Sequence, residues 1–256
     1  MSLAATSPPS AGLGGAGKMI HLRVLATLGV ELPKEAKILD FGCGAGKTVN
    51  ALRALGFVNA SGYDVVEGRH REGVDWEHIK EGTVLNLQLP YEDDTFDLVI
   101  SDQVFEHVQD QVSVFRELHR ITKPGGHGLH LIPTRYVPIE GHLLVPFGGV
   151  FQHRWLYKLW AVLGIRTRNQ EGLTADEIAD DNAFFAIEAT RYVPSSCYRV
   201  IWKRLGFEHK FAEQEFFDGH VRPSARRIGK LGAPAAWLYR TFRGRVVYLR
   251  KAVPTA

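Results

Sequence analysis

The sequence predicts an α/β protein with a doubly wound, mostly parallel sheet of seven strands and an α-rich insertion after the fifth strand. Strand and helix patterns alternate along most of the chain, which indicates a parallel sheet covered by helices on both faces. The continuous apolar run at residues 98–100 is typical of a strand buried on both faces. A glycine-rich segment, residues 40–46, lies between a strand pattern and a helix pattern.

Short apolar runs, ended by glycine, proline or acidic residues, mark the expected elements. We expect strands at residues 37–41, 58–63, 83–87, 96–101, 127–132, 208–217 and 245–250. We expect helices at residues 18–30, 47–55, 112–122, 195–205 and 224–242, and a short helix within 67–81. Residues 123–126, Lys-Pro-Gly-Gly, should end a helix and turn the chain.

The chain divides into a tail and one domain. Residues 1–17 are mostly alanine, glycine, serine and proline, so we expect a disordered tail followed by a domain at 18–256. Residues 134–187 are too long for an ordinary connection, so we expect an insertion that forms a lid or substrate site over the sheet's carboxyl edge. We expect most of its aromatic residues to form a small core of the insertion, namely Tyr136, Phe147, Phe151, Trp155, Tyr157 and Trp160.

The overall composition narrows the class of protein. Hydrophobic residues make up 45% and charged residues 23%, as in globular proteins with a full core. We find neither a run of ~20 apolar residues nor a signal-peptide pattern, so we expect a cytoplasmic protein. Cys43 and Cys197 have no disulfide or metal-ligand spacing, and we expect two reduced thiols.

Positive charge gathers at the end of the chain. Residues 219–256 contain nine lysines and arginines but no aspartate or glutamate. Such a segment can attract phosphates, anionic lipid or nucleic acid. A solvated surface without a charged partner is the commoner outcome, and we favour it here.

The spacing of the glycine-rich segment Asp40-Phe41-Gly42-Cys43-Gly44-Ala45-Gly46 separates two kinds of nucleotide site. A dinucleotide fingerprint needs a glycine at position 47, which is Lys47. The observed pattern, acid-x-Gly-x-Gly-x-Gly, resembles motif I of class I S-adenosylmethionine-dependent methyltransferases. The resemblance implies a Rossmann-like fold, S-adenosylmethionine as cofactor, and a loop at Asp40, Gly42, Cys43, Gly44 and Gly46 that holds its amino-acid end.

Further segments extend this resemblance to residues 37–132. Residues 89–99, 106–108, 115–118 and 123–126 are similar, in the same order, to methyltransferases of the ubiquinone-biosynthesis type. Asp64 ends the second strand pattern 18 residues after Gly46, where the family has its ribose-binding acid. The remaining expected cofactor contacts are Val65, Asn86 and Leu87 near the adenosine, and Ser101 and Gln103 after the fourth strand. Relatives often have an acid where Asn86 stands, so the adenine contact is the least defined.

Candidates for chemistry follow the fourth and fifth strands. His107 is the candidate general base, because a hydroxyl acceptor must lose a proton and histidine titrates near neutral pH. Glu106 would orient His107 or contact substrate; the alternative is that His107 only packs at the start of a helix. Glu140, His142 and His153 are further candidates, with His142 the foremost. Glu140-x-His142 supplies two potential ligands without a third, so we expect no metal.

Three functions remain open at this stage. The leading one is methyl transfer to a small-molecule, sugar or lipid acceptor, at oxygen, with peripheral membrane contact through residues 143–165 as one version. A nucleic-acid methyltransferase is less favoured, because we find no nucleic-acid-binding module. A non-catalytic S-adenosylmethionine-binding module is the third. The sequence fixes neither the acceptor nor the oligomeric state.

Overall fold

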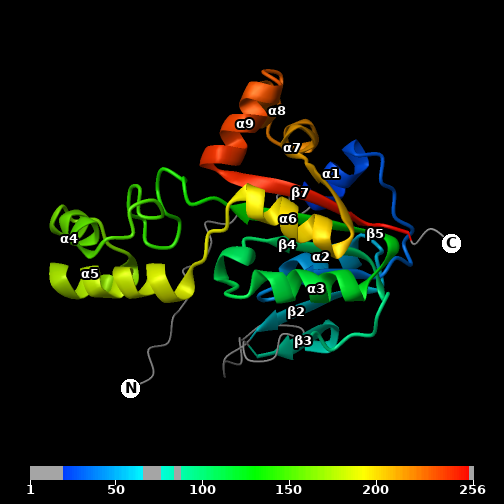
Figure 1. Ribbon diagram of the computed structural model, residues 1–256, viewed down its shortest axis with the longest axis horizontal. Coiled ribbons are helices and arrows are strands. Elements are labelled where there is room, and N and C mark those ends of the chain that lie inside the picture. The colour runs from blue at the N-terminus through cyan, green and yellow to red at the C-terminus, as the bar shows by residue number, and fades with distance from the viewer. Residues whose placement is uncertain (1–19, 66–75, 84–87, 254–256) are drawn as a thin grey trace.

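A computed structural model describes residues 20–65, 76–83 and 88–253 (Figure 1). Its strands are β1 (Ile38–Phe41), β2 (Ala60–Val65), β3 (Ile79–Gly82), β4 (Phe96–Asp102), β5 (Thr122–Pro133), β6 (Phe207–Phe211) and β7 (Gly244–Lys251). They form one sheet in the order β3-β2-β1-β4-β5-β7-β6, in which β7 runs antiparallel to both neighbours and the other pairs are parallel. The expected doubly wound, mostly parallel sheet of seven strands is therefore confirmed. The expected tail at 1–17 lies outside the described residues.

Helices cover both faces of the sheet (Figure 1). They are α1 (Ile20–Thr27), α2 (Lys47–Ala54), α3 (Gln111–Ile121), α4 (Arg154–Val162), α5 (Ala175–Phe184), α6 (Ser195–Leu205), α7 (Glu213–Gly219), α8 (Pro223–Gly229) and α9 (Ala233–Phe242). Alternate strand residues feed two cores: Leu39 and Val99 pack with α3 and α6, whereas Ile38 and Leu98 pack with α1 and α7. Successive side chains of a strand point to opposite faces of the sheet. Because both faces of β1 and β4 are covered by helices, neighbouring residues of these strands are both apolar.

The third strand lies earlier than the sequence predicted. It is Ile79–Gly82, paired with Gly62–Val65 of β2, and Thr83 follows it. Because β3 is at the edge of the sheet, Ile79 is its only buried residue, so its sequence is too polar to be recognised by hydrophobicity. Residues 84–87 lie outside the described part. The expected turn at 123–126 is also different, since β5 already begins at Thr122.

Two predictions near the end of the chain were wrong in extent. The strand expected at 208–217 ends at Phe211, and α7 follows it because Phe216 and Phe217 are both buried against neighbouring helices. The helix expected at 224–242 is two helices, α8 and α9. The chain turns between them at Gly232, whose φ of 66° favours glycine, and a proline at the start of α9 cannot continue a helix.

The segment between β5 and α6 begins with turns and loops over residues 134–153 and then contains the helices α4 and α5, which project from one end of the sheet in Figure 1. The expected α-rich insertion is therefore helical in its second part. Its small core includes Leu143, Val145 and Tyr157. Most of its aromatic residues are not in that core, contrary to our expectation. Tyr157 is buried and Trp160 half-buried, but four side chains are about half exposed or more, namely Tyr136, Phe147, Phe151 and Trp155.

The two cysteines are free, as predicted, with Cys43 buried and Cys197 exposed. Among the described residues, no helix has the length and apolar character that a membrane crossing requires.

Candidate active site

The glycine loop after β1 is shaped by backbone conformations that only glycine adopts easily. Gly42, Gly44 and Gly46 have φ angles of 76°, 54° and 69°. A Cβ atom on Gly42 would lie 2.3 Å from Cγ2 of Val104, and one on Gly46 would lie 2.5 Å from Cδ1 of Ile79. The loop therefore packs closely on the residues that follow β4 and on the start of β3, and it leads into α2.

The carboxylate of Asp64 meets this loop at the end of β2. One oxygen accepts a hydrogen bond from the Gly44 amide, and the other accepts one from the Val65 amide at 2.7 Å. The amides of Gly42 and Cys43 donate to the Tyr63 carbonyl at 2.8 and 3.1 Å. The structure thus joins the predicted loop and the predicted ribose acid into one site, at the edge where open α/β sheets bind ligands.

The other predicted cofactor residues have different surroundings. Asp40 is buried within β1, and Gln103 is exposed just after β4 with a φ of 54°. Ser101 is fully buried: its hydroxyl lies 2.9 Å from Nδ1 of His130, and its carbonyl oxygen lies 3.4 Å from Nε2 of His21. Asn86 and Leu87 lie outside the described residues.

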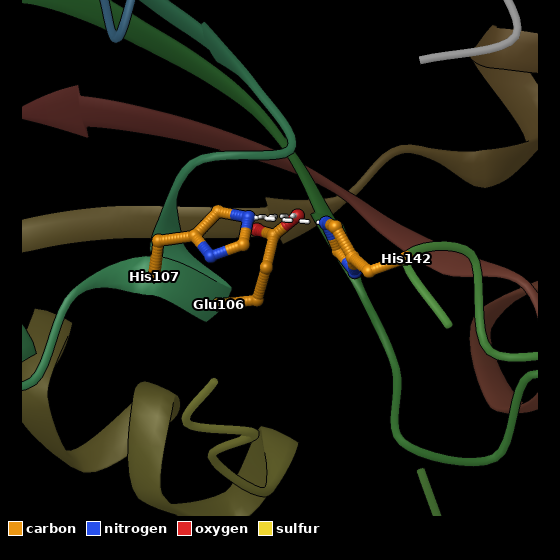
Figure 2. A group of neighbouring side chains, drawn as sticks. All are labelled: Glu106, His107 and His142. Carbon is orange, nitrogen blue, oxygen red and sulfur yellow. Dashed lines mark hydrogen bonds and ion pairs between the residues drawn. The ribbon is translucent and has the colours of Figure 1, made fainter. Parts of the chain in front are cut away.

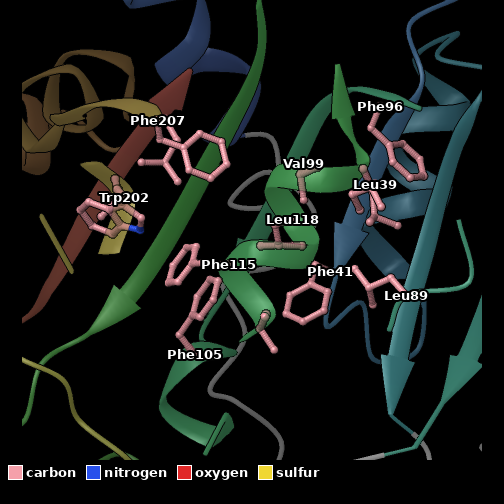
Figure 3. Packing of buried hydrophobic residues seen from close by; sticks show 14 of the residues in the cluster. Leu39, Phe41, Leu89, Phe96, Val99, Phe105, Phe115, Leu118, Trp202 and Phe207 are labelled. Atoms are coloured by element: carbon pink, nitrogen blue, oxygen red, sulfur yellow. The ribbon is translucent and has the colours of Figure 1, made fainter. Parts of the chain in front are cut away.

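Glu106 and His107 belong to a short 3-10 helix, η2 (Phe105–His107), that is held by the core. Phe105 is fully buried and stacks on Phe115 of α3 with ring centroids 4.4 Å apart, and Phe41 of β1 lies beside it (Figure 3). Because Phe105 is fixed in the core, the next two side chains have defined positions at the carboxyl edge of the sheet.

His107 faces His142, which comes from the loop after β5 (Figure 2). Their Nε2 atoms are 3.1 Å apart. His107 Nδ1–H donates to the carbonyl of Ala189, at the end of a π-helical turn η4 (Phe185–Ala189), at 2.9 Å. Burial lowers the pKa of His107, and the bond to Ala189 offsets only part of this effect. Three segments that are distant in the sequence therefore meet at His107.

Glu140 is the acceptor that organises the loop of His142. It is 4% exposed and accepts hydrogen bonds from His142 Nδ1 at 2.8 Å, from the amides of His142 and Leu143, and from the Tyr192 hydroxyl at 3.1 Å. Burial alone would raise the pKa of Glu140, but the donors of His142 and Leu143 hold it below its usual value. Burial likewise disfavours charge on His142, but Glu140 outweighs it and raises the pKa of His142.

Glu106 is the least satisfied group at the site. It is 1% exposed, and neither carboxylate oxygen has a hydrogen-bond partner. Burial raises its pKa to about 8. Oε1 of Glu106 lies 4.0 Å from Nε2 of His107, too far for a hydrogen bond. The site therefore combines a buried carboxyl group with two histidines, which gives it a capacity to bind a proton or a cation.

The predicted catalytic residues thus come together, except for His153. Two groups that contact them were not predicted. His153, the exception, is exposed at the start of α4. The sequence did not reveal the Ala189 carbonyl or the Tyr192 hydroxyl, because both reach the site from more than 50 residues after Glu106 and have no local motif.

A known protein family matches most of the chain. The family model described as a methyltransferase domain matches residues 18–208, which is most of the chain. Two solved structures share the fold across nearly the whole chain. A methyltransferase from Mesorhizobium loti has a TM-score of 0.54 at 20% identity, covering 94% of this chain and 100% of that one. A putative sarcosine dimethylglycine methyltransferase from Galdieria sulphuraria has a TM-score of 0.51 at 17% identity, covering 92% and 85%.

Similar sequences include methyltransferases of more than one kind. The ubiquinone biosynthesis O-methyltransferase of Ruegeria pomeroyi is 30% identical over 140 residues, 50% of this chain and 53% of that protein. The norajmaline N-methyltransferase of Rauvolfia serpentina is 34% identical over 100 residues, 36% of this chain and 34% of that protein. The matches thus span about half or less of each of these relatives. The chain therefore belongs to the methyltransferase-domain family, and it shares the fold of the solved methyltransferases.

Proposed function

We propose that the protein methylates a hydroxyl group of a small-molecule, sugar or lipid acceptor, with His107 as general base. S-adenosylmethionine supplies an electrophilic methyl group when bound, so the chain's own task is to align the acceptor and receive its proton. The observation that carries this proposal is the pair of facing Nε2 atoms of His107 and His142, 3.1 Å apart beside the residues that follow β4.

The hydrogen bonds behind the two rings support a role in proton transfer. Because both Nδ1 atoms donate outward, to Ala189 and to Glu140, the neutral rings present their Nε2 lone pairs to each other. A proton released by the acceptor hydroxyl can be held between these atoms. The buried Glu140 carboxylate would stabilise the imidazolium that forms, as a buried acid does behind a catalytic histidine.

Calorimetry tests the cofactor site first. Wild type and Gly44→Arg are titrated with S-adenosylmethionine, and with NAD as a control. We expect micromolar binding of S-adenosylmethionine to wild type, about −8 kcal/mol, and none to the variant. Release of S-adenosylhomocysteine is then measured across matched hydroxyl and amine acceptors. Turnover confined to amines would contradict methylation at oxygen, and absence of turnover with every acceptor would favour the non-catalytic module.

Membrane contact and a cytoplasmic location are part of the same proposal. Exposed apolar residues on α4, Trp155 and Leu159 among them, support a lipid-facing surface on the projecting segment. Flotation with anionic liposomes tests it, and a protein that stays entirely at the bottom of the gradient would remove this part. The basic end of the chain gives little support for a nucleic-acid acceptor. Two of its basic residues, Arg240 and Lys251, form ion pairs with Glu213 and Asp94 of the same chain.

A further inference from the structure

The three side chains shown in Figure 2, Glu106, His107 and His142, point toward one another. One ring nitrogen of His107, one of His142 and an oxygen of Glu106 lie within 4.8 Å of one another. Glu106 is almost completely buried, and both of its carboxylate oxygens lack a partner. A buried carboxylate is costly unless a proton or an opposite charge compensates it, and a cation held by the two histidines and Glu106 would supply that charge.

Both histidines are oriented as metal ligands are. Each Nδ1–H is used in an outward hydrogen bond, at 2.9 Å to the Ala189 carbonyl and at 2.8 Å to Glu140. A carbonyl or carboxylate behind the ring fixes the tautomer in which Nε2 has a free lone pair. Two such lone pairs that face each other at 3.1 Å repel unless a positive charge lies between them.

We propose that Glu106, His107 and His142 bind one divalent transition-metal ion of the zinc class. Two imidazole nitrogens and one carboxylate oxygen suit zinc, iron or cobalt, whereas magnesium and calcium prefer oxygen ligands. Nitrogen ligands ~2.0–2.1 Å from one tetrahedral ion stand about 3.3 Å apart, close to the observed separation of the two Nε2 atoms. The Glu106 oxygen is 4.0 Å from His107 Nε2 and within 4.8 Å of the His142 ligand atom, so it needs to approach by up to about 1.5 Å.

The proposed ligands in the structure differ from the pair of potential ligands, Glu140 and His142, that the sequence suggested. Glu140-x-His142 had two potential ligands and no third, which was the reason to expect no metal. In the structure, Glu140 is not a ligand but the hydrogen-bond acceptor behind His142. Glu106, 36 residues before His142, supplies the carboxylate, and its neighbour His107 supplies the second imidazole.

An ion with three protein ligands keeps a position for substrate. The side chain of His107 is 38% exposed, so this position can open toward solvent. The inference rests on the proposed function and changes how the acceptor is activated. A hydroxyl bound to the ion has a lowered pKa and loses its proton to water. Its oxygen then forms the bond to the methyl carbon as the carbon–sulfur bond breaks, leaving S-adenosylhomocysteine.

Metal binding is tested without turnover. The full chain is stripped with a chelator and dialysed, then titrated with ZnCl₂ by calorimetry and with CoCl₂ by visible absorption. We compare wild type with Glu106→Gln, His107→Gln and His142→Gln. His153→Gln is the matched control, because this exposed histidine at the start of α4 is not among the three converging side chains. Near-UV circular dichroism and S-adenosylmethionine affinity report whether each variant keeps its fold.

We expect one tight zinc ion per chain in wild type and in His153→Gln, undisturbed by millimolar magnesium. Each ligand variant should weaken zinc binding at least ~100-fold and lose the visible cobalt bands. Glu140→Gln should weaken it ~10–100-fold, the usual effect of removing a group behind a histidine ligand. Folded ligand variants that bind zinc as wild type does, or a His153→Gln loss as large as theirs, would overturn the proposal.

The two proposals fail differently. Normal S-adenosylmethionine binding and hydroxyl methylation by chelator-treated protein, with no zinc bound, would leave the proposed function intact and remove the metal site. Zinc bound through the three residues, without methylation of any hydroxyl, would support the metal site and contradict the acceptor class.

Discussion

The glycine loop and the histidine site lie at the same edge of the sheet, but they are built in opposite ways. The loop at residues 42–46 is made of backbone, and its contacts come from the end of β2, the start of β3 and the residues that follow β4. The histidine site is made of side chains from three segments, namely η2, the loop after β5, and the chain that follows α5.

This difference predicts different vulnerabilities. A backbone site fails when a side chain is added, because there is no room for a Cβ atom. A side-chain site fails when a functional group is removed, and also when distant packing shifts one of its segments. The cofactor site should therefore tolerate changes in the projecting helices, whereas the chemistry at His107 should not.

The largest expected effect is at the side-chain site. Once an acceptor is known, His107→Gln should lower kcat by ~10²–10⁴-fold, the usual range for a lost general base, and the loss of a metal ligand at this residue would lower kcat as well. S-adenosylmethionine affinity should remain within a few-fold of wild type, since the loop does not use His107. Steady-state release of S-adenosylhomocysteine measures the first quantity and calorimetry the second. His153→Gln is the control. A parallel loss of cofactor affinity would show that the two sites are not separable.

The next effect breaks the backbone site. Gly42→Ala places a Cβ atom against Val104 and adds strain at a φ of 76°. We expect a loss of ~2–4 kcal/mol in the free energy of unfolding and at least a tenfold loss of S-adenosylmethionine affinity. Gly29→Ala has the same φ with nothing within 4 Å of the added atom, so it isolates the strain alone. Urea denaturation should show only ~1 kcal/mol for Gly29→Ala; equal losses in both variants would refute the steric argument.

The same contrast explains what the sequence could predict. The loop, Asp64 and most strands were predictable, because each depends on a short pattern of glycines, acids or apolar residues. Edge strand β3 was misplaced because its exposed sequence, Ile-Lys-Glu-Gly, has little hydrophobic signal. His107, Glu106 and His142 were found as separate candidates. Their convergence, and the roles of Glu140 and Tyr192, depend on tertiary contacts between residues up to 82 positions apart.

A third histidine, His130, should make the stability of the fold depend on pH. His130 is fully buried against Ser101, and burial lowers its pKa to about 3. The unfolded chain binds this proton below about pH 6.5, but the folded protein does not until about pH 3. The free energy of unfolding should therefore fall by up to ~1.4 kcal/mol per pH unit as pH drops through that window.

Urea denaturation between pH 7 and 4.5 measures this slope. His130→Gln keeps a partner for Ser101 but cannot titrate, so its profile should be flatter even if its stability at pH 7 is lower. Zinc binding should be unchanged, because His130 is not among the three proposed ligands. An unchanged acid slope in the variant would assign the pH dependence to other groups.

The smallest effect tests whether the projecting segment supports only the side-chain site. The hydroxyl of buried Tyr157 donates to the Gly148 carbonyl at 2.9 Å and ties α4 to the chain that follows His142. Tyr157→Phe should cost about 1 kcal/mol of unfolding free energy, the usual net value of one hydrogen bond. Tyr136→Phe, on a half-exposed ring, should change it by less than ~0.5 kcal/mol. S-adenosylmethionine affinity should stay at the wild-type value in both variants, because the described contacts that shape the glycine loop come from β2, β3 and Val104. Weaker cofactor binding in Tyr157→Phe would mean that the projecting helices support both sites, and the division between a backbone site and a side-chain site would not hold.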